Sequence, residues 1–242
     1  MKTICIIPAR GGSKGLLRKN ILTLAGKPLI HWPIKAALKS KYIDEVFVTT
    51  DDEEIAEKAI SAGAKVPFLR PTELAQSLTT TEETLQYALL AYEEFLGCKF
   101  EICVFLTATS IFRSVEWIDQ AVKSLIDNPQ IESAFAVTKT TKNFWYENDL
   151  GNNARIFEWM KTYSSRQIRK HIYIEDTGHA CASRANLWRN GKRIGDNVHL
   201  ISNDNTESFI DIHTEFDLYL AEKAIEYFKI KDPSRVKIFL EE

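Results

Sequence analysis

The feature that most constrains the fold is a short, continuous apolar run near the start of the chain. Ile4, Cys5, Ile6 and Ile7 follow one another without a polar residue. A strand with one face in water alternates apolar and polar residues, whereas a strand that is apolar throughout is covered on both faces. Pro8 then removes a backbone donor, so the ladder ends there. The run therefore predicts a sheet strand with helices above and below it.

The loop after this strand, residues 10–20, has the composition of an anion-binding loop. Its glycines let the backbone approach a ligand, and successive backbone amides can form a concave anion site. The carboxyl end of a first strand is also where open α/β sheets bind ligands. We therefore predict a phosphate site here, with a basic surface turn as the alternative. The residues concerned are Gly11, Gly12, Ser13 and Gly15, with the cations Arg10, Lys14, Arg18 and Lys19.

Strand-like and helix-like segments alternate through the first half of the chain. Apolar runs predict strands at 45–50, 101–106 and 132–138, and a later one at 208–212. Helical periodicity and capping residues predict helices that begin at Pro28, near residue 52, and after Thr80, Ser114 and Thr214. This βαβα order favours an α/β, Rossmann-like open sheet that is mostly parallel and has helices on both faces.

Residues 139–176 interrupt this alternation. They are rich in aromatic and basic residues, contain a polar turn at 148–153 and lack a clean buried strand. An insertion of this kind between sheet strands is either a lid over the site or an arm that packs on another subunit. We expect residues 1–242 to form one domain that carries 139–176 as the inserted arm or lid.

Composition and motifs exclude several classes of function. The formal net charge of −2 and the pI near 6.3 give no support for nucleic acid or an anionic membrane as a partner. The glycine loop is neither a Walker loop nor a dinucleotide fingerprint. The chain shows no secretory signal, no apolar stretch of membrane-spanning length and four scattered cysteines without a C-x-x-C pair. We expect a cytoplasmic protein with reduced cysteines and no zinc site.

Polar residues follow several predicted strands. Asp51 and Asp52 follow the strand at 45–50, where helix capping is favoured over ligand contact. Arg70, before Pro71, offers a planar fork for a base carbonyl or a phosphate, or forms a surface salt bridge. The hydroxyls and the arginine of residues 107–113 suit a sugar or a carboxylate, but also an ordinary helix entry. Asp211, predicted at a strand end facing the loop, suggests Mg²⁺.

These segments together resemble the acylneuraminate cytidylyltransferases, which activate sialic acid and related nine-carbon sugars as CMP derivatives. The resemblance spans nearly the whole chain, and its first motif is specific to this group. The matching segments are IIPARGGSKGLLRKN at 6–20, VTTDDEEIAEKA at 48–59, PFLRPTELA at 67–75, SIFR at 110–113, RQ at 166–167 and IDIHTEFDLYLAE at 210–222.

The resemblance implies roles for individual residues. Nucleotide binding falls to Arg10, Gly11, Ser13, Lys14, Asn20, Arg70 and Thr81, with Arg70 at the cytosine. Sugar binding falls to Thr107, Ser110, Arg166, Gln167 and His213. Lys14, Arg10 and Asp211 are the implied catalytic residues, Asp211 being the ligand of Mg²⁺. In the family the arm packs on a partner subunit, which implies a homodimer.

Three positions depart from the family pattern. Thr107 and Ala108 stand where glutamine and proline are usual, and the glutamine contacts the sugar in relatives. Ser77 stands where an aspartate is common. His213 replaces the second aspartate of an Asp-x-Asp pair, and neutral imidazole is a poor ligand for Mg²⁺. His213 is therefore a proton acceptor, a substrate contact or an exposed histidine beside a helix cap.

The resemblance implies a cytidylyltransferase that uses CTP, Mg²⁺ and an acidic nine-carbon sugar of the sialic, legionaminic or pseudaminic acid type. Two alternatives stay open at this stage. One is a nucleotidyltransferase that uses GTP or another nucleotide with a sugar 1-phosphate. The other is a sugar-nucleotide binding protein with weak catalysis, which Thr107 and His213 would explain. The sequence does not specify the acid sugar or the order of substrate binding.

Overall fold

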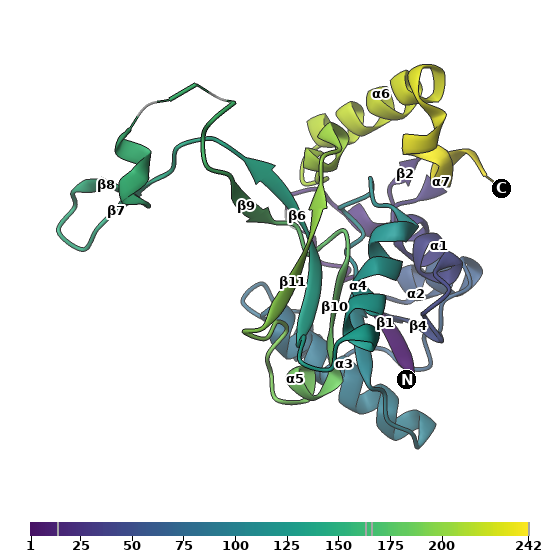
Figure 1. Cartoon of the computed structure of the whole chain (residues 1–242). Helices are drawn as coiled ribbons and strands as arrows, with labels where there is room; N and C mark the ends of the chain where they lie inside the picture. Colours follow the sequence, from purple (N-terminus) through teal and green to yellow (C-terminus); the bar gives the residue numbers. More distant parts are fainter. Residues whose placement is uncertain (14, 163, 166, 242) are drawn as a thin grey trace.

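The centre of the protein is a seven-stranded sheet with the order β11-β6-β10-β5-β1-β4, and β9 pairs with β6 beside this path (Figure 1). The computed structural model describes residues 1–13, 15–162, 164–165 and 167–241. The strands of the sheet are β1 (Thr3–Pro8), β4 (Glu45–Thr49), β5 (Ile102–Phe105), β6 (Ser133–Thr140), β9 (Ile172–Glu175), β10 (Cys181–Arg184) and β11 (Val198–Asn203).

Most strands of this sheet run in the same direction. β1 pairs in parallel with β4 on one side and with β5 on the other, and β11 pairs in parallel with β6. β10 is antiparallel to both β5 and β6, and β9 is antiparallel to β6. In the register, Ile6 lies between Phe47 and Phe105. The predicted open, mostly parallel α/β sheet is therefore confirmed.

Helices cover both faces of the sheet, as predicted. α1 (His31–Lys39), α2 (Glu53–Ser61) and α4 (Val115–Asp127) share a core cluster with Cys5 and Ile7 of β1. α3 (Thr81–Leu96) and α5 (Ala185–Arg189) share a second cluster with Ile4 and Ile6. Successive residues of β1 thus enter opposite clusters, and all four are fully buried. This is why the opening run contains no polar residue.

A third cluster lies beside the sheet and is built from α6 (Glu215–Lys231), α7 (Lys237–Leu240) and the segment around α1. No helix within the described residues is long and apolar enough to cross a bilayer. The remaining short elements are η1 (Lys19–Ile21), β2 (Thr23–Leu24), β3 (Lys27–Pro28), η2 (Thr72–Ala75), β7 (Trp145–Glu147), β8 (Asn153–Arg155), η3 (Glu158–Lys161), η4 (Thr206–Phe209) and η5 (Pro233–Val236).

Capping explains where most helices begin. The side chain of Asp52 accepts from Ile55 N at 2.9 Å, so the capping interpretation of this aspartate is confirmed. Thr80 with Glu83, and Thr214 with Asp217, each form a reciprocal capping box at the start of α3 and α6. These caps fix the helix ends that lie at the carboxyl edge of the sheet.

The predicted helix start at Pro28 is wrong. Pro28 pairs with Thr23 in a small hairpin of β2 and β3, and α1 begins only at His31. The turn of this hairpin is Ala25–Gly26, and both residues have positive φ, at 48° and 77°. Hairpin turns favour such left-handed residues. The short hairpin therefore uses Pro28 as a strand residue rather than as the first residue of a helix.

The predicted strand at 208–212 is also wrong. Residues 206–209 form the 3₁₀ turn η4, and Ile212 packs in the third core cluster instead of in a ladder. The strand that fills this edge is β11, which is mostly exposed and so lacks a continuous apolar run. Asp211 consequently lies in an irregular segment between η4 and α6, not at a strand end.

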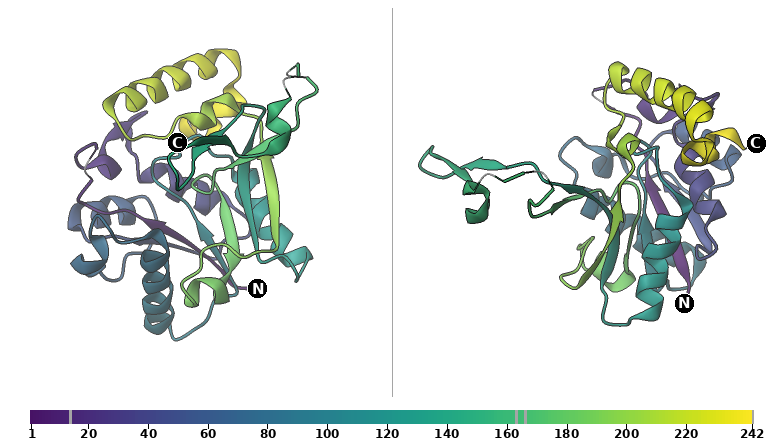
Figure 2. Two further views of the ribbon diagram at one scale, coloured as in Figure 1. Left: turned by 90° about the vertical axis from the view of Figure 1, so that its left-hand side faces the viewer. Right: turned by 45° about the horizontal axis from the view of Figure 1, so that its top comes forward.

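Residues 139–176 project from the body of the protein as an extended arm (Figures 1 and 2). The ends of β6 and β9 pair along its base, and β7 and β8 form a hairpin further out. Several large apolar side chains of the arm are exposed. They are Trp145, Tyr146, Leu150, Ile156, Phe157, Ile168, Tyr173 and Ile174.

A buried ion pair joins α3 to α5 on one face of the sheet. Glu93 is 2% exposed and accepts from Arg189 Nη2 at 2.5 Å and from Phe100 N at 2.9 Å. Lys99 donates to its second oxygen at 2.9 Å. Burial alone would raise the pKa of Glu93, but these hydrogen bonds hold it below its usual value.

We expect Arg189→Met to lower the free energy of unfolding by about 2–4 kcal/mol, because it leaves the buried carboxylate without its main partner. The matched control is Lys123→Met, which removes an exposed pair with Asp127 and should change stability by less than ~1 kcal/mol. Urea unfolding at neutral pH measures both.

The pair should also give a pH dependence of a definite sign. The pKa of Glu93 is lower in the folded protein than in the unfolded chain. The stabilisation that Glu93 adds to the free energy of unfolding is therefore complete above the usual carboxyl pKa, and it disappears as the pH falls through the lowered pKa. The difference in the free energy of unfolding between wild type and Arg189→Met should therefore become smaller at acidic pH. A difference that is constant with pH would contradict this account.

Candidate active site

A cavity of about 510 Å³ opens beside the carboxyl ends of β1 and β5. Its walls come from four segments that are far apart in the sequence. They are the glycine loop, residues 70–84, the loop after β5 and the segment before α6. The lining residues are Pro8, Arg10, Ser13, Gly15, Leu16, Lys19, Asn20, Arg70, Leu74, Ala75, Gln76, Ser77, Thr79, Thr80, Thr81, Thr84, Thr107, Ala108, Thr109 and His213.

Side-chain contacts hold the glycine loop in a closed turn. Asn20 is buried, and its amide donates to Arg10 O at 2.9 Å, which ties the two ends of the loop together. Gly11 N donates to Asp51 Oδ1 at 3.0 Å. A Cβ on Gly11 would lie 2.7 Å from Asp52 Oδ2, whereas one on Gly12 would meet no atom of the described residues within 4 Å. The loop therefore needs glycine at position 11 because α2 begins directly beside it.

The cations of the loop differ in their partners. Arg18 donates to both carboxylate oxygens of Asp52 at 2.9 Å and to Glu54 at 2.7 Å, so its charge is offset by α2. Arg10 instead lines the cavity and donates to Gln76 O at 3.1 Å. Lys19 also lines the cavity, and burial lowers its pKa while Asp211 opposes that shift. Among the described loop residues, Arg10 and Lys19 therefore present their positive charge to the cavity, whereas Arg18 does not.

Arg70 forms a second buried cation in the cavity wall. It is 5% exposed, and its nearest carboxylate is Asp51, at 3.8 Å from Nη2. Its backbone N–H donates to Thr50 O at 2.7 Å, which fixes the segment against the end of β4. Burial lowers the pKa of Arg70, yet the guanidinium stays charged near neutral pH. Arg70 therefore does not form an exposed surface salt bridge, which was the alternative prediction.

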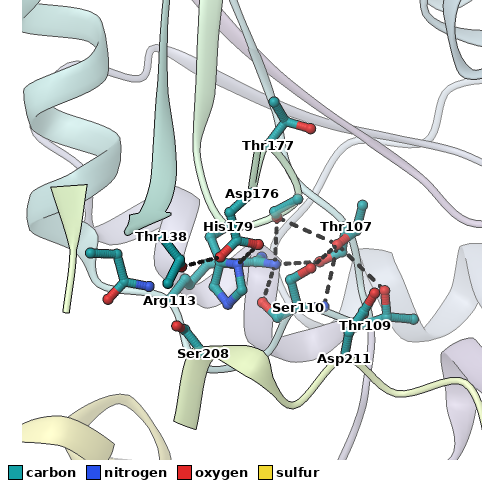
Figure 3. Close-up of polar contacts among 12 residues, drawn as sticks. Thr107, Thr109, Ser110, Arg113, Thr138, Asp176, Thr177, His179, Ser208 and Asp211 are labelled. Atoms are coloured by element: carbon teal, nitrogen blue, oxygen red, sulfur yellow. Dashed lines mark hydrogen bonds and ion pairs between the residues drawn. The ribbon is translucent and has the colours of Figure 1, made fainter. Parts of the chain in front are cut away.

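The loop after β5 forms the opposite wall and is held from behind by Arg113 (Figure 3). Arg113 is buried, and its Nη2 donates to the carbonyls of Thr107, Ser110 and Gly178. Thr107 Oγ1 lies 2.9 Å from Ser110 Oγ. Burial lowers the pKa of Arg113 to about 10, so it remains a cation at neutral pH. Its charge backs the wall that carries Thr107 and Ser110.

Asp211 and His213 lie at the same edge. His213 Nε2 is 2.7 Å from Asp211 Oδ2, and the backbone N–H of His213 donates to the cap residue Asp217 at 3.0 Å. The other oxygen of Asp211, Oδ1, is buried and has no hydrogen-bond partner among the described residues. A carboxylate oxygen with free lone pairs fits a divalent cation that takes its remaining ligands from water and phosphate.

No group of three or more histidine, cysteine or acidic side chains suited to a metal occurs within the part of the chain that the structure describes. A cation held at Asp211 would therefore depend on oxygen atoms of a bound nucleotide. This is the usual binding mode of Mg²⁺ in nucleotide sites.

The cavity brings together most of the residues that the sequence singled out. Those that line it are Arg10, Ser13, Asn20, Arg70, Thr81, Thr107 and His213. Gly11, Ser110 and Asp211 lie beside it without lining it. Gln167 is exposed on the arm and is not brought to this cavity. Lys14 and Arg166 lie outside the described residues.

A polar cluster behind the loop wall was not predicted from the sequence. Asp176 and His179 lie in the turn between β9 and β10, and His179 is fully buried. No spacing signal connects them to Thr107, because their proximity arises only when β10 pairs with β5. Lys19 was expected only as part of the basic loop, and Thr84 of α3 was not expected in the cavity at all.

Comparisons with known proteins agree with this geometry. A cytidylyltransferase family model matches residues 4–235. The pseudaminic acid cytidylyltransferase of Campylobacter jejuni subsp. jejuni is 38% identical over 196 residues, covering 78% of this chain and 81% of that protein. The CMP-N,N'-diacetyllegionaminic acid synthase of Legionella pneumophila subsp. pneumophila is 32% identical over 235 residues, covering 93% and 97%.

Solved structures show the same fold. A CMP:2-keto-3-deoxy-manno-octonic acid synthetase complexed with CTP superposes with a TM-score of 0.67 at 16% identity, covering 94% of this chain and 99% of that one. A cytidylyltransferase from Leptospira borgpetersenii gives 0.63 at 17% identity, covering 98% and 92%. By the extent of the family match and by these relatives, the chain belongs to the cytidylyltransferase family.

Proposed function

We propose that the chain transfers CMP from CTP to the anomeric hydroxyl of a nonulosonic acid sugar and releases pyrophosphate. The observation that carries this proposal is the cavity that joins the glycine loop to the Thr107 wall. The loop offers amides and cations to a triphosphate, and the wall offers hydroxyls to a sugar. Relatives that are similar in sequence are named for pseudaminic, legionaminic and N-acylneuraminic acid.

The reaction needs few covalent steps from the protein. The anomeric oxygen attacks the α-phosphorus of CTP in line, the bond from that phosphorus to the β-phosphate oxygen breaks, and the hydroxyl loses its proton. Such displacements depend on positioning and on neutralising negative charge that spreads over phosphate oxygens. Arg10 and Lys14 would supply that positive charge from the loop. A divalent cation, which we propose is Mg²⁺ held by Asp211, would add charge neutralisation at the phosphates.

The nucleotide half of the cavity accommodates the other assigned residues. Arg70 offers a planar pair of donors that suits the carbonyl of cytosine, and its burial makes that contact strong. Gly11 and Ser13 would contact phosphates through the loop backbone. Asn20 already closes the loop through Arg10 O, so its contact with ribose would be a second role. Thr81, in the first turn of α3, lines the same half of the cavity.

Within the chain, Thr107, Ser110 and His213 would contact the bound sugar. Gln167 is exposed and falls in the range 139–176, which forms the arm that projects from the body (Figure 1). Arg166 precedes it in the sequence. We therefore propose that these two residues reach the sugar bound by a second copy of the chain. The exposed apolar side chains of the arm support a homodimer, because an apolar surface of this extent is rarely left in water.

We propose that residues 1–242 act as a single nucleotidyltransferase domain, with 139–176 as its dimerisation arm. We also propose a cytoplasmic location. All four cysteines are free, which suits a reducing compartment.

The direct test is pyrophosphate release from CTP with sialic, legionaminic and pseudaminic acids in the presence of Mg²⁺. We expect turnover with at least one acid, and loss of turnover when EDTA removes the cation. A parallel reaction with ATP should be slower by ~100-fold or more, because adenine lacks the ring carbonyl to which Arg70 would donate. Turnover of GTP with a sugar 1-phosphate, or nucleotide binding without any turnover, would contradict the proposal.

Gly11→Ala should weaken CTP binding roughly tenfold or more. The added Cβ would fall 2.7 Å from Asp52 Oδ2, and Asp52 cannot yield freely since it caps α2 and pairs with Arg18. The matched control is Gly12→Ala, whose Cβ would meet no neighbour within 4 Å in the part of the chain that the structure describes. Isothermal titration with CTP measures both variants. Equal CTP affinities for the two would show that the loop does not position the nucleotide.

The homodimer should be visible as a molar mass of twice the chain in light scattering. Replacing exposed apolar residues of the arm hairpin, as in Trp145→Ser with Leu150→Ser, should shift the mass toward the monomer. Because Gln167 and Arg166 would then be lost from the partner's site, acceptor turnover should fall while CTP binding stays. A wild-type monomer with full activity would contradict the arm's assignment.

A further inference from the structure

The pair formed by Asp176 and His179 has no part in the function described so far. Neither residue lines the cavity, but their turn lies directly behind the Thr107 wall, which Gly178 contacts. His179 Nδ1 is 2.8 Å from Asp176 Oδ1. Thr138 Oγ1 donates to the second oxygen, Oδ2, at 3.3 Å. A carboxylate can only accept, so the ring places its N–H on Nδ1. Figure 3 shows the carboxylate between these two partners.

The two members of the pair differ in exposure. The His179 side chain is 1% exposed, and its ring packs edge-on against Trp117, with ring centroids 6.0 Å apart. The Asp176 side chain is 23% exposed. The imidazole is thus the interior member of the pair, and the carboxylate is the partly exposed member. A carboxylate has about four lone-pair sites, of which His179 and Thr138 occupy two.

The pair is not needed to close its own turn. The backbone already does this, because Asp176 N donates to Ala136 O at 3.0 Å and His179 N donates to Asp176 O at 3.1 Å. Nor does the pair fill an apolar gap, since Nε2 of His179 is buried without a hydrogen-bond partner among the described residues. A buried polar atom in that state is unfavourable, so a purely structural role would be better served by an apolar side chain.

The turn is locked to the acceptor wall. Thr107 N donates to Gly178 O at 3.1 Å, and Arg113 Nη2 reaches the same carbonyl at 3.0 Å. A Cβ on Gly178 would lie 2.4 Å from Ser110 Oγ and 2.8 Å from Thr107 Oγ1, so only glycine permits this contact. Asp176, two residues before Gly178, is therefore held in a fixed relation to Thr107 and Ser110 (Figure 3).

The chemistry of the acceptor then selects which part of it Asp176 can contact. A nonulosonic acid carries a carboxylate at one end and hydroxyl and amide N–H groups along the rest of the molecule. Asp176 would repel the acid end and accept hydrogen bonds from the hydroxyl or amide donors. Arg113 is a buried cation with no carboxylate within ion-pair distance among the described residues. Burial lowers the pKa of Arg113, and the Asp176 carboxylate is among the charges that oppose this shift.

We propose that Asp176 is a specificity-determining residue for the acceptor, which binds donor groups of the sugar away from its carboxylate, and that His179 is the positioning residue that fixes the Asp176 carboxylate. This inference rests on the proposed function and goes beyond it by naming residues that would select the acceptor.

The test is steady-state kinetics of the full chain with CTP and each of the three acids. Asp176→Asn should raise the KM for the preferred acid ~10- to 100-fold, the loss expected for one or two hydrogen bonds to a charged group, while the KM for CTP changes less than ~2-fold. The order of preference among the acids should also change, because they differ in the donors that face Asp176. Glu175→Gln, which alters the neighbouring exposed carboxylate, should leave both KM values unchanged.

The positioning role of His179 has a separate readout. His179→Leu removes the donor and should raise the acceptor KM, whereas His179→Asn, whose amide N–H can replace Nδ1–H, should restore most of it. Thermal unfolding of each variant shows whether the fold is retained. If His179→Leu fails to fold, Asp176→Asn still decides the proposal.

The outcomes separate the two proposals. If the wild type turns over at least one acid and Asp176→Asn has an unchanged acceptor KM, only this inference is overturned. An equal rise in the KM values for CTP and acid would likewise overturn it, because the effect would then lie outside acceptor binding. If the wild type turns over none of the acids, the proposed function fails, and this inference fails with it.

Discussion

The parallel pairing of β1 with β4 and β5 is the constraint on which the site depends. Parallel strands end at the same edge of a sheet, so the segments after all three strands are forced to meet. Those segments are the glycine loop, the start of α2 at Asp52, and the loop that begins at Thr107. The cavity lies where they converge, and its opposite walls belong to residues a hundred positions apart. Sheet pairing, not local sequence, therefore defines the site.

The electrostatics of this edge follow from partial desolvation of cations. Arg70 and Arg113 are both buried, and burial lowers the pKa of each without neutralising it near pH 7. Lys19 is affected in the same direction. Taking cations out of water without close carboxylates is unfavourable, and a bound polyanion offsets that cost. By contrast Arg18, which two carboxylates already satisfy, serves to hold the loop against α2.

The sequence predicted those features that have a local physical signal. The unbroken apolar run of β1, the Thr80 and Thr214 capping boxes and the periodicity of α4 each report on a few neighbouring residues, and each was confirmed. The helix start predicted at Pro28 was wrong because a short hairpin with a two-residue turn, Ala25–Gly26, precedes α1. The apolar segment at 208–212 misled because core packing of Ile212 competes with strand pairing, while the true edge strand, β11, is too exposed to be recognised.

The residues of the candidate site also fall into those with a local sequence signal and those without one. Arg10 and Arg70 were visible because glycines, cations and a proline mark their segments. Ser13 and Asn20 were assigned from the family resemblance, and all four line the cavity. Asp176 and His179 have no local sequence signal. Their turn comes close to Thr107 only because β10 pairs with β5 and brings Gly178 against Thr107. Family resemblance supplies the reaction, but the departures at Thr107 and His213 leave acceptor recognition to be explained by residues that the resemblance does not mark.

The proposed function requires the glycine loop to hold the triphosphate of CTP at the carboxyl edge of the sheet. A crystal structure of the protein with CTP and Mg²⁺ would show whether it does. We expect phosphates within hydrogen-bond distance of the loop amides, Arg10 and Lys14, with cytosine at Arg70 and the cation at Asp211. Nucleotide bound instead in the second cavity of the described structure, about 900 Å³ in volume and lined by Lys39 and Lys237, would contradict it.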